Sequence, residues 1–328
     1  MIVDAGFGLR GRQNVQVLKK GKVCRESGFH KNLILDNFFN DLTNPSATTT
    51  MGSTLSYQHV VVGTGSTAPA PTQTNLATYL AGKSTTDGAT VSTYLGVVNN
   101  KAQYKWSRTW TFTESAVTGN VSEVGTKNAS TPGTLSATAL HTRALVLDVN
   151  SNPTSIPVGA GEQLRVIHEF LFEVDLTAFS QNMSVTTGGN TTNHTVEMQW
   201  TNITTAANFT QFILESTIFR GTGGSAVLAP SNTYSSLTFG AGNTTPTVGT
   251  GFATSAVKTH TQPSGVLTAR LNWSIPSTGG NATGGIGGMH VGGTSAGNAP
   301  LCVKFTPALP KTSLNKLVIG FDFTYTRL

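Results

Sequence analysis

The sequence predicts an all-β protein, an antiparallel β-sandwich or jelly-roll-like fold with one or two short helices near the N-terminus. Only 11% of the 328 residues are charged, against roughly 25% in a typical globular protein, and Thr, Ser, Asn and Gly fill the difference. The hydrophobic residues, 38% of the chain, fall in short clusters separated by turn signals. Strand and helix patterns do not alternate regularly, which argues against a parallel α/β sheet.

The N-terminal third combines short strands with the predicted helices. Residues 13–25 form two apolar-polar stretches around a Lys-Lys-Gly-Lys turn, which predicts a hairpin. The next segment, Lys31–Leu42, is apolar at positions that share one helical face, so it predicts a helix ending near Pro45. Tyr57–Val62 predicts a buried strand that runs into a Gly/Thr/Pro turn, and a second short helix is predicted at Asn75–Ala81.

From Gln103 onward the residue pattern is typical of strands. Gln163–Leu176 is apolar at nearly every second position and predicts a central strand, and Leu317–Tyr325 alternates in the same way at the end of the chain. Residues 278–299 are mostly Gly, Thr, Ser and Asn, which predicts a long surface loop or backbone that another chain approaches closely. The other predicted strands are Tyr104–Phe112, Arg143–Asp148, Thr195–Trp200, Phe212–Phe219, Ser236–Phe239 and Gly265–Ser274.

Positive charge is concentrated at the N-terminus. Residues 1–31 contain seven bases and two acids, so they hold +5 of the formal net charge of +6. We therefore divide the chain into a basic arm or hairpin, 1–31, and a β-sandwich body, 32–328. The arm is a candidate for docking on an acidic partner; the simpler interpretation is a solvated edge hairpin that its lysines keep soluble. Its bases, the candidate docking residues, are Arg10, Arg12, Lys19, Lys20, Lys22, Arg25 and Lys31.

Nucleic acid is a less suitable partner for this arm, because no aromatic residue for base stacking occurs among the bases before Phe29. The two cysteines, Cys24 and Cys302, lie far apart without a CxxC spacing, and two unpaired thiols are the expected state. No secretory signal pattern opens the chain, and no apolar run approaches the roughly 20 residues that span a bilayer. We expect a protein made in the cytoplasm, without a membrane span.

Three segments resemble ligand-binding motifs, but in each case the neighbouring residues are incompatible with the motif. Residues 63–68 fit the dinucleotide pattern G-x-G-x-x-A, but Pro69 and Pro71 follow where a helix should begin. Residues 81–84 resemble the end of a phosphate-binding loop whose first glycine would be at position 77, which is Ala. Residues 148–152 resemble a calcium loop, but Pro153 replaces its glycine, so an Asn-rich β-turn is the better interpretation.

No catalytic or metal-binding set emerges from the remaining polar residues. The seven histidines lack the i, i+4 spacing of metal ligands, and the fifteen acids are too dispersed to nominate a catalytic pair. His168 and Glu169 lie in a predicted strand, where neighbouring side chains face opposite sides, so we interpret them as a satisfied polar pair. We expect no enzymatic activity, no cofactor and no bound metal.

Four segments, in order, resemble the N-terminal half of many bacteriophage tail and virion-surface structural proteins. In these proteins a K-N-L-I helix precedes a strand, a G-x-G-x-x-x-P turn and a D/Q-T-x-L segment, and two later pieces fit the same pattern. The matching segments here are Phe29–Asp36, His59–Leu76, Trp110–Gly125 and Arg143–Leu164, so the resemblance covers roughly residues 28–176 and, loosely, the closing strand. Residues 177–311 depart from it and are a candidate for an elaboration specific to this member.

The resemblance implies a β-sandwich-like protein of a bacteriophage virion, made in the host bacterial cytoplasm, and members of the family occupy several places in the particle. Our first hypothesis is a non-enzymatic structural component of the tail, neck or baseplate. Its expected partners are further copies of the chain, as a homo-oligomer, and neighbouring virion proteins. One alternative is a host-receptor-binding adhesin or tail fibre protein, in which residues 278–299 and the Thr-rich middle would be exposed tips that bind a cell-surface receptor. The other is a capsid decoration protein.

Overall fold

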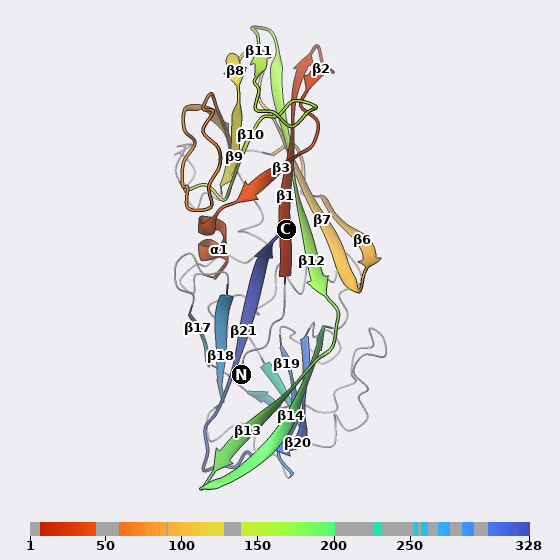
Figure 1. The fold of residues 1–328 in the computed structure, drawn as a ribbon, viewed down its shortest axis with the longest axis vertical. Helices are drawn as coiled ribbons and strands as arrows, with labels where there is room; N and C mark the ends of the chain where they lie inside the picture. Colours follow the sequence, from red (N-terminus) through yellow and green to blue (C-terminus); the bar gives the residue numbers. More distant parts are fainter. Residues whose placement is uncertain are drawn as a thin grey trace.

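The computed structural model confirms an all-β, antiparallel fold (Figure 1). It describes residues 7–43, 59–84, 86–89, 91–127, 139–200, 226–230, 252–254, 257–261, 268–275, 284–291 and 301–328. Within these ranges the one helix is α1, Asp36–Thr43. The predicted strands Phe212–Phe219 and Ser236–Phe239 lie outside the described residues.

The strands form a large sheet of thirteen strands, a sheet of six and a pair formed by β8 and β11. In chain order, the strands of the first half are β1 (Phe7–Lys19), β2 (Lys22–Glu26), β3 (His30–Ile34), β4 (His59–Gly63), β5 (Tyr79–Lys83), β6 (Val91–Val98), β7 (Lys101–Thr111), β8 (Gly119–Val121), β9 (Glu123–Lys127), β10 (Thr142–Leu145), β11 (Ile156–Val158) and β12 (Gln163–Asp175). Those of the second half are β13 (Phe179–Thr187), β14 (Asn190–Trp200), β15 (Ala226–Pro230), β16 (Phe252–Thr254), β17 (Val257–Thr261), β18 (Thr268–Ile275), β19 (Ile286–Val291), β20 (Leu301–Leu309) and β21 (Leu317–Arg327).

The large sheet is organised around β1 and β12. These two strands pair over twelve residues, from Phe7 opposite Val174 to Leu18 opposite Gln163. The other edge of β12 pairs with β7, so the prediction of a central strand at Gln163–Leu176 is confirmed. The other edge of β1 is shared by β21, β3 and β2 in succession. Strand β1 therefore has partners on both edges and lies in the middle of the large sheet.

The predicted hairpin around Lys-Lys-Gly-Lys is confirmed as β1 and β2. Its two turn residues, Lys20 and Gly21, have φ angles of 51° and 75°, and two positive φ angles are what a tight two-residue hairpin turn requires. Our boundary between an arm at 1–31 and a body at 32–328 falls inside β3. Residues 7–31 thus share a continuous sheet with the body.

The helix prediction at Lys31–Leu42 is right for its second half and wrong for its first. Asn32 pairs with Gly11 of β1, and Ile34 pairs with Thr142 of β10, so the backbone before Asp36 is a strand. The apolar periodicity suits a helix, but the two neighbouring strands take the backbone hydrogen bonds of this segment. Within α1 the predicted apolar face is present, since Phe38 and Phe39 are buried.

The second predicted helix, Asn75–Ala81, is wrong. Residues 75–78 are turns and irregular backbone, and β5 begins at Tyr79. The amides of Ala77 and Thr78 donate to the carboxylate of Glu123, at 3.0 Å and 2.8 Å. These amides are therefore not available for the hydrogen bonds of a helix.

The six-stranded sheet lies at the lower end of the elongated molecule, with the strand order β13-β14-β20-β19-β15-β16 (Figure 1). All six strands fall within the expected elaboration, 177–311. The prediction of a surface loop at 278–299 is wrong for residues 286–291, which form β19 between β15 and β20. The strand reads Ile-Gly-Gly-Met-His-Val, and its side chains Ile286 and Met289 are buried.

The buried side chains of both sheets form one continuous hydrophobic core. It includes Val15, Phe170 and Trp110 from the large sheet, and Val196 and Phe305 from the six-stranded sheet. Among the described residues, no helix has the length and apolar character needed to cross a membrane.

Candidate functional site

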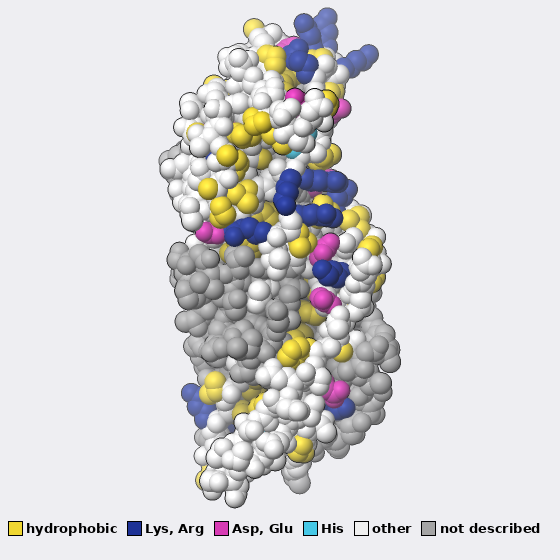
Figure 2. Space-filling view, in the orientation of Figure 1, with side chains coloured by type: hydrophobic (Ala, Val, Ile, Leu, Met, Phe, Trp, Pro, Cys, Tyr) yellow, Lys and Arg dark blue, Asp and Glu magenta, His cyan; other side chains and the backbone are white. Residues whose placement is uncertain are grey.

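The seven predicted docking residues divide into three groups. Lys19, Lys20 and Lys22 are exposed and gather at the turn of the β1–β2 hairpin. This hairpin forms one end of the molecule, where Figure 2 shows a group of basic side chains. We name these three residues the lysine tip. Three cations within four residues give this end of the folded molecule an exposed positive charge.

Two of the seven bases are held by acids of the body. The Arg12 guanidinium contacts Glu169 at 2.6 Å and also lies over the Phe29 ring, 4.7 Å from its centroid. Arg25 pairs with Glu162. These two arginines anchor the hairpin to β12 and to the turn before it, so they are less available for docking.

Arg10 of β1 and Lys31 of β3 are exposed, but they lie along inner strands of the sheet rather than at the tip. Lys31 lies opposite Arg12 in the register of β3 and β1. The structure thus brings together the lysine tip but not the full set of seven residues. Docking by these residues stays a prediction.

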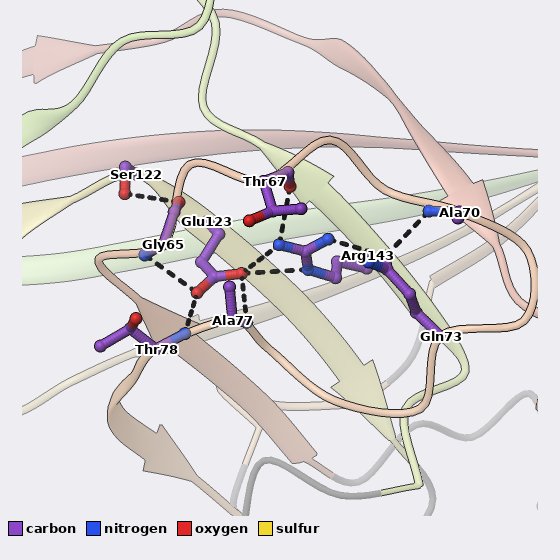
Figure 3. Close-up of polar contacts among 9 residues, drawn as sticks. All are labelled: Gly65, Thr67, Ala70, Gln73, Ala77, Thr78, Ser122, Glu123 and Arg143. Atoms are coloured by element: carbon purple, nitrogen blue, oxygen red, sulfur yellow. Dashed lines mark hydrogen bonds and ion pairs between the residues drawn. The ribbon is translucent and has the colours of Figure 1, made fainter.

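A second polar centre, which the sequence analysis did not find, is the buried ion pair between Glu123 of β9 and Arg143 of β10 (Figure 3). Both side chains are fully buried, and their closest contact is 2.7 Å. Arg143 donates to the same Glu123 oxygen through Nε at 3.0 Å and through Nη2 at 2.7 Å. The register explains this proximity, because Glu123 and Arg143 belong to paired strands.

The carboxylate of Glu123 also accepts hydrogen bonds from the loop between β4 and β5. Its donors are the backbone amides of Gly65, Ala77 and Thr78, at 2.8 to 3.0 Å. With the two bonds from Arg143 the carboxylate accepts five hydrogen bonds, all from protein donors. A buried charge is tolerated when it is paired and hydrogen-bonded in this way.

Arg143 extends the same network to the middle of the loop. Its Nη1 donates to Oε1 of Gln73 at 2.7 Å, and its Nη2 donates to the carbonyl of Thr67 at 2.9 Å. Oε1 of Gln73 accepts a further bond from the amide of Ala70. We name Glu123, Arg143 and Gln73 the clamp, because together they hold both ends and the middle of the loop from Thr64 to Thr78.

The clamp gives a physical reason for the G-x-G pattern of this loop. A Cβ on Gly65 would lie 2.4 Å from Oε1 of Glu123 and 2.5 Å from the Cβ of Ala77. A Cβ on Gly63 would lie 2.2 Å from the carbonyl of Thr78. The glycines permit close approach to a carboxylate of the protein itself. The Gly65 amide, which a bound phosphate would need, is already donated to Glu123.

The residues of the clamp come from three of the four resembling segments. The G-x-G turn supplies Gly63 and Gly65, and the Q-T-x-L segment supplies Gln73. The third segment supplies Glu123, and Arg143 begins the fourth. The first segment joins through the backbone, since the amide of Asp36 donates to the carbonyl of Pro71. One feature of the sequence could have indicated this ion pair. Glu123 and Arg143 carry opposite charges, each is followed by an apolar residue in its strand, and each strand adjoins a glycine-rich or polar turn.

A polar cleft of about 590 Å³ lies beside the clamped loop. It is formed where the loop after β4 approaches β8 and the segment before β11. Most of its lining carries hydroxyl or amide groups and no charge: Thr64, Ser66, Asn120, Ser122, Thr154 and Ser155. The rim is fixed by a hydrogen bond from the Ser122 hydroxyl to the carbonyl of Gly65. Such a cleft suits a neutral polar ligand better than a phosphate.

The other segments with motif-like sequences have structural roles. Lys83, the lysine of the phosphate-loop-like segment, donates to the carbonyl of Thr111 at 2.6 Å. Asp148 accepts the amides of Asn150 and Asn152 within a tight turn, as the Asn-rich turn prediction requires. Cys24 is exposed and Cys302 buried, and they are not paired. Within the described ranges no cluster of three metal-ligating side chains occurs.

His168 and Glu169 are both buried, but their contacts are separate. Nε2 of His168 lies 2.7 Å from Nδ2 of Asn32, which donates to the neutral ring. Burial lowers the pKa of His168 to about 3. Glu169 instead contacts Arg12 and, at 3.4 Å, Lys105. The two residues are therefore satisfied by different partners, as expected for neighbours in a strand.

Comparison of the chain with family models, with curated proteins and with solved structures finds no match.

Proposed function

We propose that the chain is a non-enzymatic structural component of a bacteriophage virion and that it belongs to the tail, where it assembles with further copies of itself and with neighbouring virion proteins. The observation that carries the proposal is the clamp. The four segments that resemble phage tail and virion-surface proteins are far apart in sequence. The network around Glu123 and Arg143 joins three of them, and a backbone hydrogen bond from Asp36 to Pro71 attaches the first segment to the same loop.

The chemistry of the clamp supports a structural role. Its carboxylate accepts five hydrogen bonds from protein donors, and the guanidinium also donates to Gln73 and to the carbonyl of Thr67. Both charges are fully buried, so they are not offered to a substrate. A network of this kind rigidifies a scaffold and specifies one loop conformation. The low charge of the chain also limits repulsion when many identical copies assemble.

Locating the protein on particles tests this proposal. Gold-labelled antibodies against the purified chain, applied to phage particles from the producing infection, should label the tail in electron micrographs. Labelling of the capsid surface would favour the capsid decoration protein instead. Absence of the chain from purified particles would refute a virion component altogether.

The lysine tip is the proposed contact with an acidic surface of a neighbouring virion protein. Replacing Lys19, Lys20 and Lys22 by Ser, Asn and Ser should leave the fold intact, because all three residues are exposed. It should lower the copy number of the protein in particles severalfold, and raised salt should do the same to wild type. Quantitative mass spectrometry of purified particles measures this effect.

Lys316 is the matched control, an exposed lysine far from the hairpin in sequence and outside the lysine tip. Its replacement by Ser should leave the copy number unchanged. Substitutions are preferable to deletion of residues 1–31, because deletion would remove β1 from the centre of the large sheet. Normal incorporation of the triple variant would show that the lysine tip is a solvated hairpin end only.

The polar cleft favours a second candidate function, a host-receptor adhesin that binds neutral glycan. Its hydroxyl and amide lining can exchange hydrogen bonds with sugar hydroxyls, and its rim is fixed by the hydrogen bond from Ser122 to Gly65. In this case the purified protein should bind host cells and block phage adsorption, and Thr154→Trp, which fills the cleft, should abolish both effects. Adsorption that is equally blocked by wild type and by Thr154→Trp would exclude the cleft as the binding site.

A further inference from the structure

Strand β6 forms an unprotected edge of the large sheet. Among the described strands it pairs only with β7, and it lies at the outer flank of the sheet (Figure 1). Its sequence, Val-Ser-Thr-Tyr-Leu-Gly-Val-Val, has neither a charge nor a proline. Four of its side chains are large, apolar and about half exposed: Val91 (57%), Leu95 (46%), Val97 (48%) and Val98 (48%). Hydrophobic side chains are visible along this flank in Figure 2.

Natural proteins seldom leave such an edge open, because its free N–H and C=O groups pair with another strand. The usual protections are lysines, prolines or bulges. The edge strand β2 of this chain has such protection, since it contains Lys22 and Arg25. Strand β6 has only a bulge between Tyr94 and Gly96, which exposes Leu95. The chain thus protects the β2 edge of the sheet and leaves the β6 edge apolar.

The charges at the two ends of β6 have opposite signs. Asp87 precedes β6 and lies along the same edge of β7, because the Asp87 amide donates to the carbonyl of Thr109 in β7. At the far end, Lys101 lies opposite Val98 in the register of β7 and β6. The exposed fractions of these two side chains are 36% and 42%, and their ion pairs within the chain are long, at 3.8 Å and 3.7 Å. Surface pairs of this kind contribute only about 0–1 kcal/mol, so both charges can take a new partner.

We propose that the β6 edge binds the β6 edge of a second copy of this chain, antiparallel and about a two-fold axis. In this arrangement the Asp87 end of each copy meets the Lys101 end of the other, so both ends gain an opposite-charge contact. Lys101 lies one strand spacing, about 4.8 Å, behind the edge, which a lysine side chain spans. A parallel arrangement would instead bring Asp87 beside Asp87 and Lys101 beside Lys101.

The arrangement also covers the exposed apolar side chains of β6 with the same side chains of the second copy. Backbone pairing is expected on both sides of the bulge, where Val91–Thr93 of one copy meets Gly96–Val98 of the other. Self-complementary contact of this kind is what a two-fold interface requires. The pairing deepens the proposed function, on which it rests, by naming the surface through which copies of the chain assemble.

Sedimentation of the purified protein over a concentration series tests the pairing. Wild type should show a concentration-dependent dimer. Val97→Lys, which places a charge on the edge, should raise the dimer dissociation constant on the order of tenfold or more. Val149→Lys is the matched control, because Val149 is a 94% exposed valine in the Asn-rich turn, and it should dimerise like wild type. Near-ultraviolet circular dichroism should be the same for all three proteins.

Disulfide trapping tests the antiparallel direction. In a background with Cys24→Ser, Val91→Cys protein mixed with Val98→Cys protein should form a cross-linked dimer under mild oxidation, because these two positions lie opposite each other in the proposed register. Neither variant should cross-link alone, because its cysteines would lie at opposite ends of β6, roughly 23 Å apart. Cross-linking of each variant alone, without any in the mixture, would overturn the antiparallel pairing.

A monomeric wild type at every concentration, or a Val97→Lys protein that dimerises as wild type does, overturns the β6 interface. Neither result depends on where the protein resides, because both measurements use the purified chain. Conversely, absence from virions would refute the proposed function while the dimer and its cross-link persist. The two proposals therefore fail separately.

Discussion

Glu123 and Arg143 form a fully buried ion pair in the N-terminal half of the chain. Burying two charges has a large desolvation cost, which is offset here by their contact at 2.7 Å and by hydrogen bonds to the loop between β4 and β5. Removing one partner of such a pair leaves the other charge buried without compensation. The pair is therefore better understood as a device that specifies the loop than as a source of net stability.

Replacing Glu123 by Gln should destabilise the protein by about 3–5 kcal/mol. The side chain amide would place an NH₂ donor among five donors that now point at the carboxylate. Urea unfolding measures the loss. The exposed Glu26→Gln is the control and should change the free energy of unfolding by less than about 0.5 kcal/mol. A loss below about 1 kcal/mol for Glu123→Gln would contradict the clamp.

His168 makes the stability of the protein depend on pH. Burial lowers its pKa from 6.5 to about 3, so the unfolded chain binds a proton between these values that the folded chain excludes. This contribution to stability is complete above pH 6.5 and is lost as the pH falls toward 3. Its slope approaches about 1.4 kcal/mol per pH unit. In urea unfolding from pH 4 to 7, His168→Gln should show a shallower slope than wild type. An identical slope would show that His168 does not exclude the proton.

At the scale of elements, the loop from Thr64 to Thr78 shows how backbone geometry follows from a buried side chain. Its amides satisfy Glu123, so the segment neither continues as a helix nor leaves its G-x-G turn open to a ligand. The same competition acts at β3, where pairing with β1 and β10 replaces the first half of a periodic helix pattern. In both places contacts with distant strands outweigh local propensity.

Replacing Gly65 by Ala should destabilise the loop by about 1–3 kcal/mol, the usual cost of overpacking. Its Cβ would lie 2.4 Å from Oε1 of Glu123, and five hydrogen bonds hold that carboxylate in place. Gly159→Ala is the control, because its Cβ would meet only Oε2 of Glu162 at an ordinary 3.4 Å. Thermal unfolding of both variants makes the comparison. Equal melting temperatures would mean that the loop moves away from Glu123 without cost.

At the scale of the whole molecule, the end of β21 connects distant parts of the chain. Tyr325–Arg327 run parallel to Phe7–Leu9 of β1, the one parallel pairing among the strands described, and the amide of Leu328 donates to the carbonyl of Leu9. Through β21, the strands β17 and β18 join the large sheet. The last residues of the chain thus link its second half to its first strand.

Arg327 secures this connection, so Arg327→Ala should destabilise the protein by about 1.5–3 kcal/mol. The substitution removes an ion pair with Asp36, a 2.8 Å hydrogen bond to the carbonyl of Ile34 and a contact with the Phe39 ring. The exposed Arg10→Ala should cost less than about 0.5 kcal/mol. Chemical denaturation compares the free energies of unfolding of the two variants. Equal denaturation midpoints would mean that backbone pairing alone keeps β21 attached to β1.

The sequence by itself determined the all-β class, the β1–β2 hairpin, the long strands β12 and β21 and the Asn-rich turn at Asp148. These features depend on local signals: period-two alternation over many residues, a Gly-containing turn and carboxylate-to-amide bonds within five residues. The seven bases were visible as a charge count, but only three of them form a common surface, because Arg12 and Arg25 meet acids far along the chain.

Only the tertiary structure decided the partners of each strand, the place of β19 inside a sheet, the open edge at β6 and the clamp itself. The bond from Arg143 to Gln73 spans 70 positions, and that from Gly65 to Glu123 spans 58. No local pattern specifies such a separation. A buried ion pair is stable only where strand register, glycine turns and loop amides coincide, and that coincidence exists only in the folded chain.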